Sequence, residues 1–71
     1  MRHQFTAIVE RGDKILIATC PEVPEAHGQG VTREECLRDL AGSIQSVLEY
    51  RREEALAHLQ AGAESTLVEM A

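Results

Sequence analysis

The residues best suited to chemistry in this chain are two cysteines and three histidines. Cys20, His27 and Cys36 are separated by six and eight residues, whereas a structural zinc site draws four ligands, usually from closely paired positions. We therefore expect no metal here and predict that both thiols pack as small apolar side chains. None of the three histidines, His3, His27 and His58, has a serine or cysteine at a spacing that marks nucleophilic catalysis.

Nuclease chemistry would need several carboxylates that converge on metal ions about 3.5–4 Å apart. The first apolar run, Phe5 to Val9, contains no acid, and Glu10 and Asp13 are expected at a solvated hairpin tip. We therefore predict no catalytic residue, no cofactor and no enzyme activity.

Gly28 and Gly30 precede a predicted helix start, as in sites where backbone N–H groups bind phosphate. Glu34 and Glu35 would repel an anion there, and no lysine follows at the required spacing. The two glycines are better explained by a bend or by close approach of two backbones.

Composition bounds the remaining possibilities. The chain has 71 residues and a net charge of -5, which favours a single domain over residues 1–71, disfavours direct nucleic-acid binding and suits a basic partner. Its core can draw on only sixteen Leu, Ile and Val residues, so we expect self-association, as a dimer or tetramer, or a stabilising partner. No membrane span or secretory signal is recognised, which predicts a cytoplasmic protein.

Strand signals dominate the first half of the chain. Phe5–Val9 and Lys14–Cys20 are rich in β-branched and apolar residues, and Gly12 between them is expected at positive φ in a hairpin. The prolines at 21 and 24 interrupt the sheet, and residues 26–31 are predicted to resume it as a third strand.

A helix is predicted from Arg33 to about Gln60, with a break near Tyr50. Thr32 and Glu35 form a capping-box pattern at its start. An apolar stripe is expected to pack on the sheet: Leu37, Leu40, Ala41, Ile44, Val47 and Leu48. Residues 65–70 could add a short last strand or stay frayed. The predicted fold is thus α+β, a three-stranded antiparallel meander with one long helix and a short last strand (β-β-β-α-β), and one sheet face is left open.

Two motifs carry a resemblance to a known family. The run from Cys20 to Glu25, Cys-Pro-Glu-Val-Pro-Glu, is followed by Gln-Gly-Val-Thr-Arg-Glu-Glu-Cys from Gln29 to Cys36. This pattern resembles the HicB family of antitoxins, which usually has Pro-Asp-Leu-Pro-Gly and Gly-x-Thr-x-x-Glu-Ala at these places. The likeness extends from Phe5 to Tyr50. Many members carry a separate DNA-binding segment, and because the residues after Arg51 are too few for such a segment plus a last strand, we expect none here.

The resemblance implies a degenerate ribonuclease-H-like fold, an oligomer and neutralisation of a small basic HicA-type ribonuclease toxin. The net charge of -5 suits such a partner. The turn is the candidate contact, although it could equally be a wide strand connection; its expected partner-binding residues are Pro21, Glu22, Val23, Pro24, Glu25 and His27. The alternative function is a free-standing structural or regulatory oligomer with no toxin.

Overall fold

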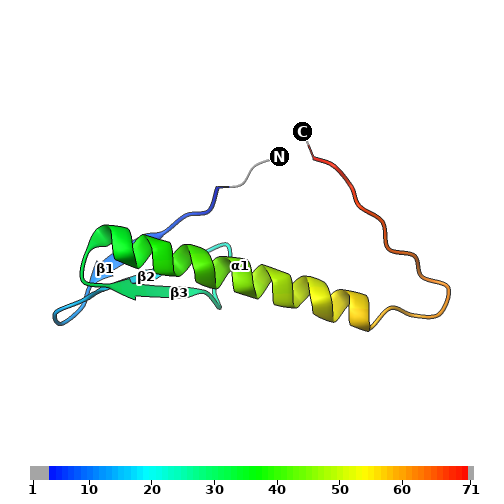
Figure 1. Ribbon diagram of the computed structural model, residues 1–71, viewed down its shortest axis with the longest axis horizontal. Helices are drawn as coiled ribbons and strands as arrows, with labels where there is room; N and C mark the ends of the chain where they lie inside the picture. The colour runs from blue at the N-terminus through cyan, green and yellow to red at the C-terminus, as the bar shows by residue number, and fades with distance from the viewer. Residues whose placement is uncertain (1–3, 71) are drawn as a thin grey trace.

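The computed structural model describes residues 4–70 and shows a small sheet crossed by one long helix (Figure 1). The strands are β1 (Ile8–Arg11), β2 (Leu16–Thr19) and β3 (His27–Gly30), and the helix α1 spans Arg33–Ala57. The sheet order is β1-β2-β3 with both pairs antiparallel. The α+β class, the meander and the long helix are therefore as predicted.

The core lies between α1 and one face of the sheet. Val9, Ala18 and Gly28 stand in register across the three strands, and Ala18 is fully buried while Ile17, next to it in β2, is 40% exposed. This alternation is that of a sheet with one covered face. The buried core consists of Ala18, Cys20, Val23, Ala26, Cys36, Leu40 and Ile44.

Small residues on β3 let α1 lie very close to the sheet. A Cβ atom on Gly28 would stand 2.5 Å from the Leu40 amide nitrogen and 2.6 Å from the Cys36 carbonyl oxygen. A Cβ on Gly30 would stand 2.7 Å from the Cys36 amide nitrogen. The predicted close backbone approach is confirmed at both glycines.

The helix begins at Arg33 as predicted and ends at Ala57, slightly before the predicted end near Gln60. The Glu35 N–H donates to Thr32 Oγ1 at 3.1 Å, and the Glu35 carboxylate accepts from the Thr32 N–H at 3.3 Å, which completes the capping box. The predicted break near Tyr50 is wrong, because α1 is continuous to Ala57. The sheet covers its first half, and its second half projects beyond the sheet (Figure 1).

The first hairpin differs from expectation in its details. The Gly12 N–H donates to the Ile15 carbonyl at 2.7 Å, but the residue at positive φ is Lys14 (78°), not Gly12. The first strand also lies further along the chain than predicted, so that Glu10 belongs to β1 and pairs with Ile17. The expectation of an acid-free first strand is therefore wrong, although Glu10 is exposed on the uncovered face.

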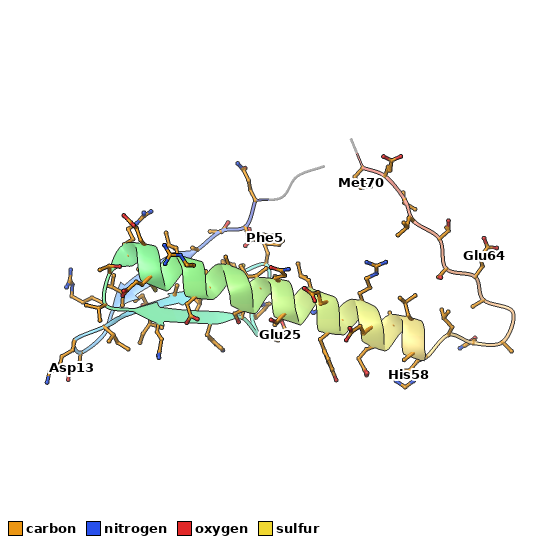
Figure 2. The ribbon with its side chains drawn as sticks, viewed as in Figure 1. Phe5, Asp13, Glu25, His58, Glu64 and Met70 are labelled. Atoms are coloured by element: carbon orange, nitrogen blue, oxygen red, sulfur yellow. The ribbon has the colours of Figure 1, made fainter. Side chains whose placement is uncertain are left out.

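The predicted last strand is also wrong. Residues 65–70 have no regular secondary structure, and Leu67 and Val68 are 82% and 76% exposed. The helix carries the chain past the sheet before the tail turns, with Gly62 at φ 87°, so the tail leaves α1 where no strand edge is present. Figure 2 shows the side chains of Glu64 and Met70 standing away from the sheet.

Within residues 4–70, no helix combines the length and the apolar character needed to cross a membrane.

Candidate functional site

The turn between β2 and β3 is folded back on itself. The Val23 N–H donates to the Cys20 carbonyl at 3.1 Å, and the Ala26 N–H donates to the Val23 carbonyl at 2.9 Å. Val23 is 1% exposed and belongs to the core. Contrary to expectation, Val23 is therefore not exposed for contact with a partner: its side chain packs in the core, and the exposed part of the turn is polar apart from its two prolines.

Glu22 holds the N-terminal segment against this turn. One carboxylate oxygen accepts from the Thr6 N–H at 2.9 Å, the other accepts from the Thr6 hydroxyl at 2.7 Å, and the Cys20 thiol donates to the first at 3.3 Å. The hydrogen bonds from the Thr6 hydroxyl and N–H favour the ionised form and lower the pKa of Glu22 to about 2. Glu22 thus presents a fixed negative charge at an exposed corner.

Glu25 stands at the other end of the turn and forms an ion pair with Arg51 of α1. The hydrogen bond from the Arg51 guanidinium lowers the pKa of the Glu25 carboxyl. The side chains of Glu25 and Arg51 are 55% and 44% exposed, so water screens this pair. Of the two carboxylates in the turn, Glu25 forms an ion pair with a cation of α1, whereas residues 4–70 contain no ion pair to Glu22.

His27 belongs to a different surface from the two carboxylates. It is exposed and lines a polar groove of about 930 Å³ between β3 and α1, together with Gln29, Glu35, Arg38 and Asp39. The structure therefore divides the six predicted contact residues. Pro21, Glu22, Pro24 and Glu25 lie at the exposed turn, Val23 lies in the core, and His27 lies at the polar groove.

This groove arises because α1 side chains satisfy the outer edge of β3. The His27 N–H donates to Ser43 Oγ at 3.1 Å, and the Gln29 N–H donates to Asp39 Oδ2 at 2.9 Å. Two strand residues span about 6.6 Å and four helical residues about 6 Å, so side chains four apart on the helix match alternate strand N–H groups. Sequence reasoning missed this match, and the four-residue spacing of Asp39 and Ser43 was its signal.

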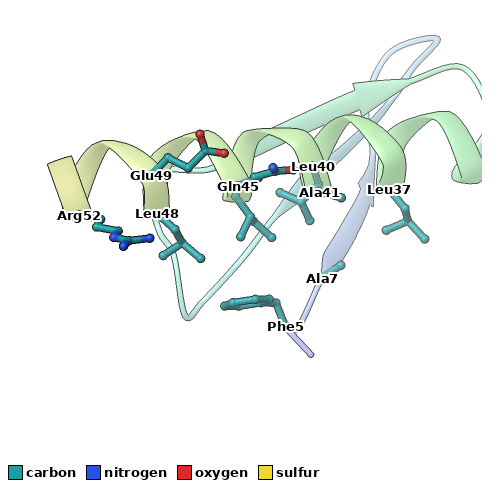
Figure 3. Close-up of a pocket in the computed structure, with 10 residues that line it drawn as sticks. Phe5, Ala7, Leu37, Leu40, Ala41, Gln45, Leu48, Glu49 and Arg52 are labelled. Atoms are coloured by element: carbon teal, nitrogen blue, oxygen red, sulfur yellow. The ribbon is translucent and has the colours of Figure 1, made fainter. Parts of the chain in front are cut away.

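A second groove, of about 740 Å³, is apolar and lies between the segment before β1 and α1 (Figure 3). Its apolar lining consists of Phe5, Ala7, Leu37, Leu40, Ala41, Ile44 and Leu48, with Gln45, Glu49 and Arg52 beside them. The prediction that one stripe of α1 packs on the sheet is therefore only half correct. Leu40 and Ile44 are buried, whereas Ala41 is exposed and Leu48 is 37% exposed along the groove.

The cysteines and histidines occupy separate places. Cys20 and Cys36 are 1% and 0% exposed, as expected of packing residues, and the Cys36 thiol donates to the Gly28 carbonyl at 3.7 Å. His58 lies near Glu54 at the end of α1, and His3 is outside the described residues. Across residues 4–70, no three His, Cys, Asp or Glu side chains gather in a way that could hold a metal ion.

Comparison with known proteins adds the family. No family model matches the chain, and no solved structure matches it. A UPF0150 protein from Synechocystis sp. is 42% identical over 55 residues, which cover 76% of this chain and 76% of that protein. With this identity over three quarters of both proteins, the chain belongs to the UPF0150 family of small proteins.

Proposed function

We propose that this chain is a non-catalytic, antitoxin-like binding protein that masks the active site of a small basic HicA-type ribonuclease toxin. The observation that carries the proposal is the Glu22 carboxylate, which is exposed, ionised and held by Thr6. A basic protein surface would meet a charge that is already ordered, so less side-chain entropy is lost on binding. The HicB-like motifs and the net charge of -5 support the same partner.

The Glu25–Arg51 pair gives the turn a second way to respond to a cationic partner. Because the pair is exposed and screened, an arginine or lysine of the partner can replace Arg51 at Glu25 at small cost. Arg51 would then turn to solvent, and the corner would present two carboxylates instead of one. The prolines at 21 and 24 restrict the backbone that carries both acids.

Other parts of the proposal follow from the HicB-like motifs. The sheet and helix would be a degenerate ribonuclease-H-like fold without nuclease activity, in a single domain that acts in the cytoplasm. The chain would associate as a dimer or tetramer and would not bind nucleic acid directly, since its net charge is unfavourable for phosphate contacts.

A second candidate function is a free-standing structural or regulatory oligomer without a toxin. The apolar groove beside α1 favours it, because this surface suits assembly and is separate from the Glu22 corner. The two candidates differ in one requirement. The antitoxin needs the acidic corner, whereas the free-standing oligomer does not.

The test is binding to a small basic HicA-type protein, sought first among the products of the genes beside this one. Co-expression should restore growth, and the two proteins should co-purify. Glu22→Gln, which removes the charge but keeps an acceptor for Thr6, should slow association and flatten its dependence on salt. Asp13→Asn at the far hairpin is the matched control, because Asp13 is exposed and carries the same charge.

Each result has a definite meaning. Slower association for Glu22→Gln and parental association for Asp13→Asn would support the acidic corner as the contact. Equal slowing by both variants would show that net charge alone matters and would remove the corner from the interface. Failure to co-purify or to restore growth would reject the antitoxin and leave the free-standing oligomer.

A further inference from the structure

The apolar groove beside α1 has large and small side chains in an order that suits another copy of itself. Ala7 and Ala41 are small and leave a hollow in the groove. The larger side chains of Phe5 and Leu48 lie beside this hollow and are 43% and 37% exposed. Figure 3 shows Leu37, Ala41 and Leu48 along one side of α1 with Phe5 facing them. A surface that bears both a hollow and a projection can be filled by its own two-fold mate.

The spacing along α1 determines how such a mate would lie. An antiparallel pair of helices with its two-fold axis between Ile44 and Gln45 places Ala41 of one copy opposite Leu48 of the other, and Leu48 opposite Ala41. The two contacts are seven residues, or about 10 Å, apart along the helix. Each Leu48 would then enter the hollow that the small Ala41 and Ala7 leave in the other copy.

The charges at the two ends of this face are also complementary. At 100° per residue, Glu34 in the first turn of α1 falls on the same side as Arg52 near the far end of the groove. In the antiparallel arrangement, Arg52 of each copy lies within one helical turn of Glu34 of the other. Antiparallel packing also brings opposite ends of the two helix dipoles together. A parallel arrangement would place like charges side by side.

We infer that two copies of this chain associate through this face of α1, with Leu48 of each copy packed over Ala41 of the other. This inference rests on the self-association in the proposed function and names the surface for it. The seven buried residues of the core are few and mostly small, which leaves a chain of this size in need of further apolar burial. The groove offers such apolar surface on α1, in addition to the exposed Ile8 and Ile17 of the sheet.

The test exchanges projection and hollow. Leu48→Ala removes the projection and Ala41→Leu fills the hollow, so each variant should weaken the dimer about tenfold or more in sedimentation equilibrium. The double variant, Ala41→Leu with Leu48→Ala, restores a large residue opposite a small one and should recover most of that loss. Both positions are at least partly exposed in the single chain, so the helix content measured by circular dichroism should not change.

A second test introduces an arginine on each of two sides of α1, one in the groove and one outside it as the matched control. Ala41→Arg should produce a monomer, and Ser46→Arg, a change from another small exposed residue on the polar side of α1, should leave the dimer intact. A dimer that persists in Ala41→Arg, or a double variant weaker than both single variants, would overturn the inference. Either result would still leave toxin binding through the Glu22 corner to be judged by its own measurement.

The exposed tail is the rival occupant of the groove, since Leu67 and Val68 are apolar and unburied. A chain that ends at Ala61 separates the two cases. If the helix faces pair, the shortened chain should dimerise like the full chain. Loss of the dimer on removal of the tail would assign the groove to the tail and overturn the inference.

Discussion

Replacement of Gly28 by alanine tests the packing of α1 on the sheet. The added Cβ would lie 2.5 and 2.6 Å from backbone atoms of Leu40 and Cys36, and 2.7 Å from the Leu40 Cβ. Backbone atoms in the middle of a helix cannot turn aside as a side-chain tip can, so α1 must lift from β3. Overpacking of this kind costs about 1–3 kcal/mol, and loosened contacts around the buried Leu40 add to that cost.

The matched control is Gly42→Ala, the same chemical change at an exposed position of α1 itself. No atom lies within 4 Å of a Cβ at Gly42, so only helix propensity changes, and alanine should stabilise by about 0.5–1 kcal/mol. The two variants should therefore differ by about 1.5–4 kcal/mol, and 1 kcal/mol shifts the melting temperature of a domain this small by about 4–8 °C.

Urea and thermal unfolding followed by circular dichroism measures this difference, at one fixed protein concentration because the proposed self-association would make stability depend on concentration. Alanine at Gly28 also restricts the unfolded chain, which alone would stabilise by about 0.4–1 kcal/mol. A Gly28→Ala protein at least as stable as the parent would thus mean that the close contact with α1 does not exist. The destabilisation must come from the clash, since Gly28 has no positive φ that alanine would strain.

Two further predictions concern single hydrogen-bonded groups. Thr32→Ala removes the acceptor for the Glu35 N–H and should lower the free energy of unfolding by about 1 kcal/mol. A Thr32→Ala protein that is as stable as the parent in urea would reject the cap. The pKa of Glu22 is about 2 in the folded chain against 4.5 normally, so its contribution is complete above pH 4.5 and is lost as the pH falls toward 2. The parent's advantage in melting temperature over Glu22→Gln should therefore shrink across that interval, and an advantage that stays constant down to pH 2 would contradict the assigned hydrogen bonds.

Local signals predicted those parts of the fold that depend on neighbours in sequence. The Thr32 cap is contained in four consecutive residues, and the antiparallel order of the strands follows from short connections. Gly28 and Gly30 alternate along β3, which is the period of one strand face, and both allow the same close approach to α1. Each of these features could be read because its physical cause lies within a few residues.

The errors concern residues whose environment is set by distant parts of the chain. The two prolines exclude Val23 from the ladder, but they do not determine whether its side chain turns inward, and packing under α1 decided that. Ala41 and Leu48 follow the helical period of the core, yet the sheet is too narrow to cover both them and Leu40. The tail contains residues that favour strands, but it leaves the helix far from the sheet and therefore has no strand edge to join.

The outer edge of β3 is already occupied by side chains of α1, which affects how this chain can contact other proteins. Asp39 and Ser43 of α1 occupy the outer N–H groups of β3, which makes that edge a poor template for another strand. To reach those groups, α1 must lie over β3, and this position turns its Leu37–Leu48 side away from the sheet toward Phe5. The glycines that admit the helix therefore also determine which helix face is left uncovered. Substitutions at Gly28 should consequently disturb the proposed dimer as well as folding, whereas those at Glu22 should leave the proposed dimer unchanged.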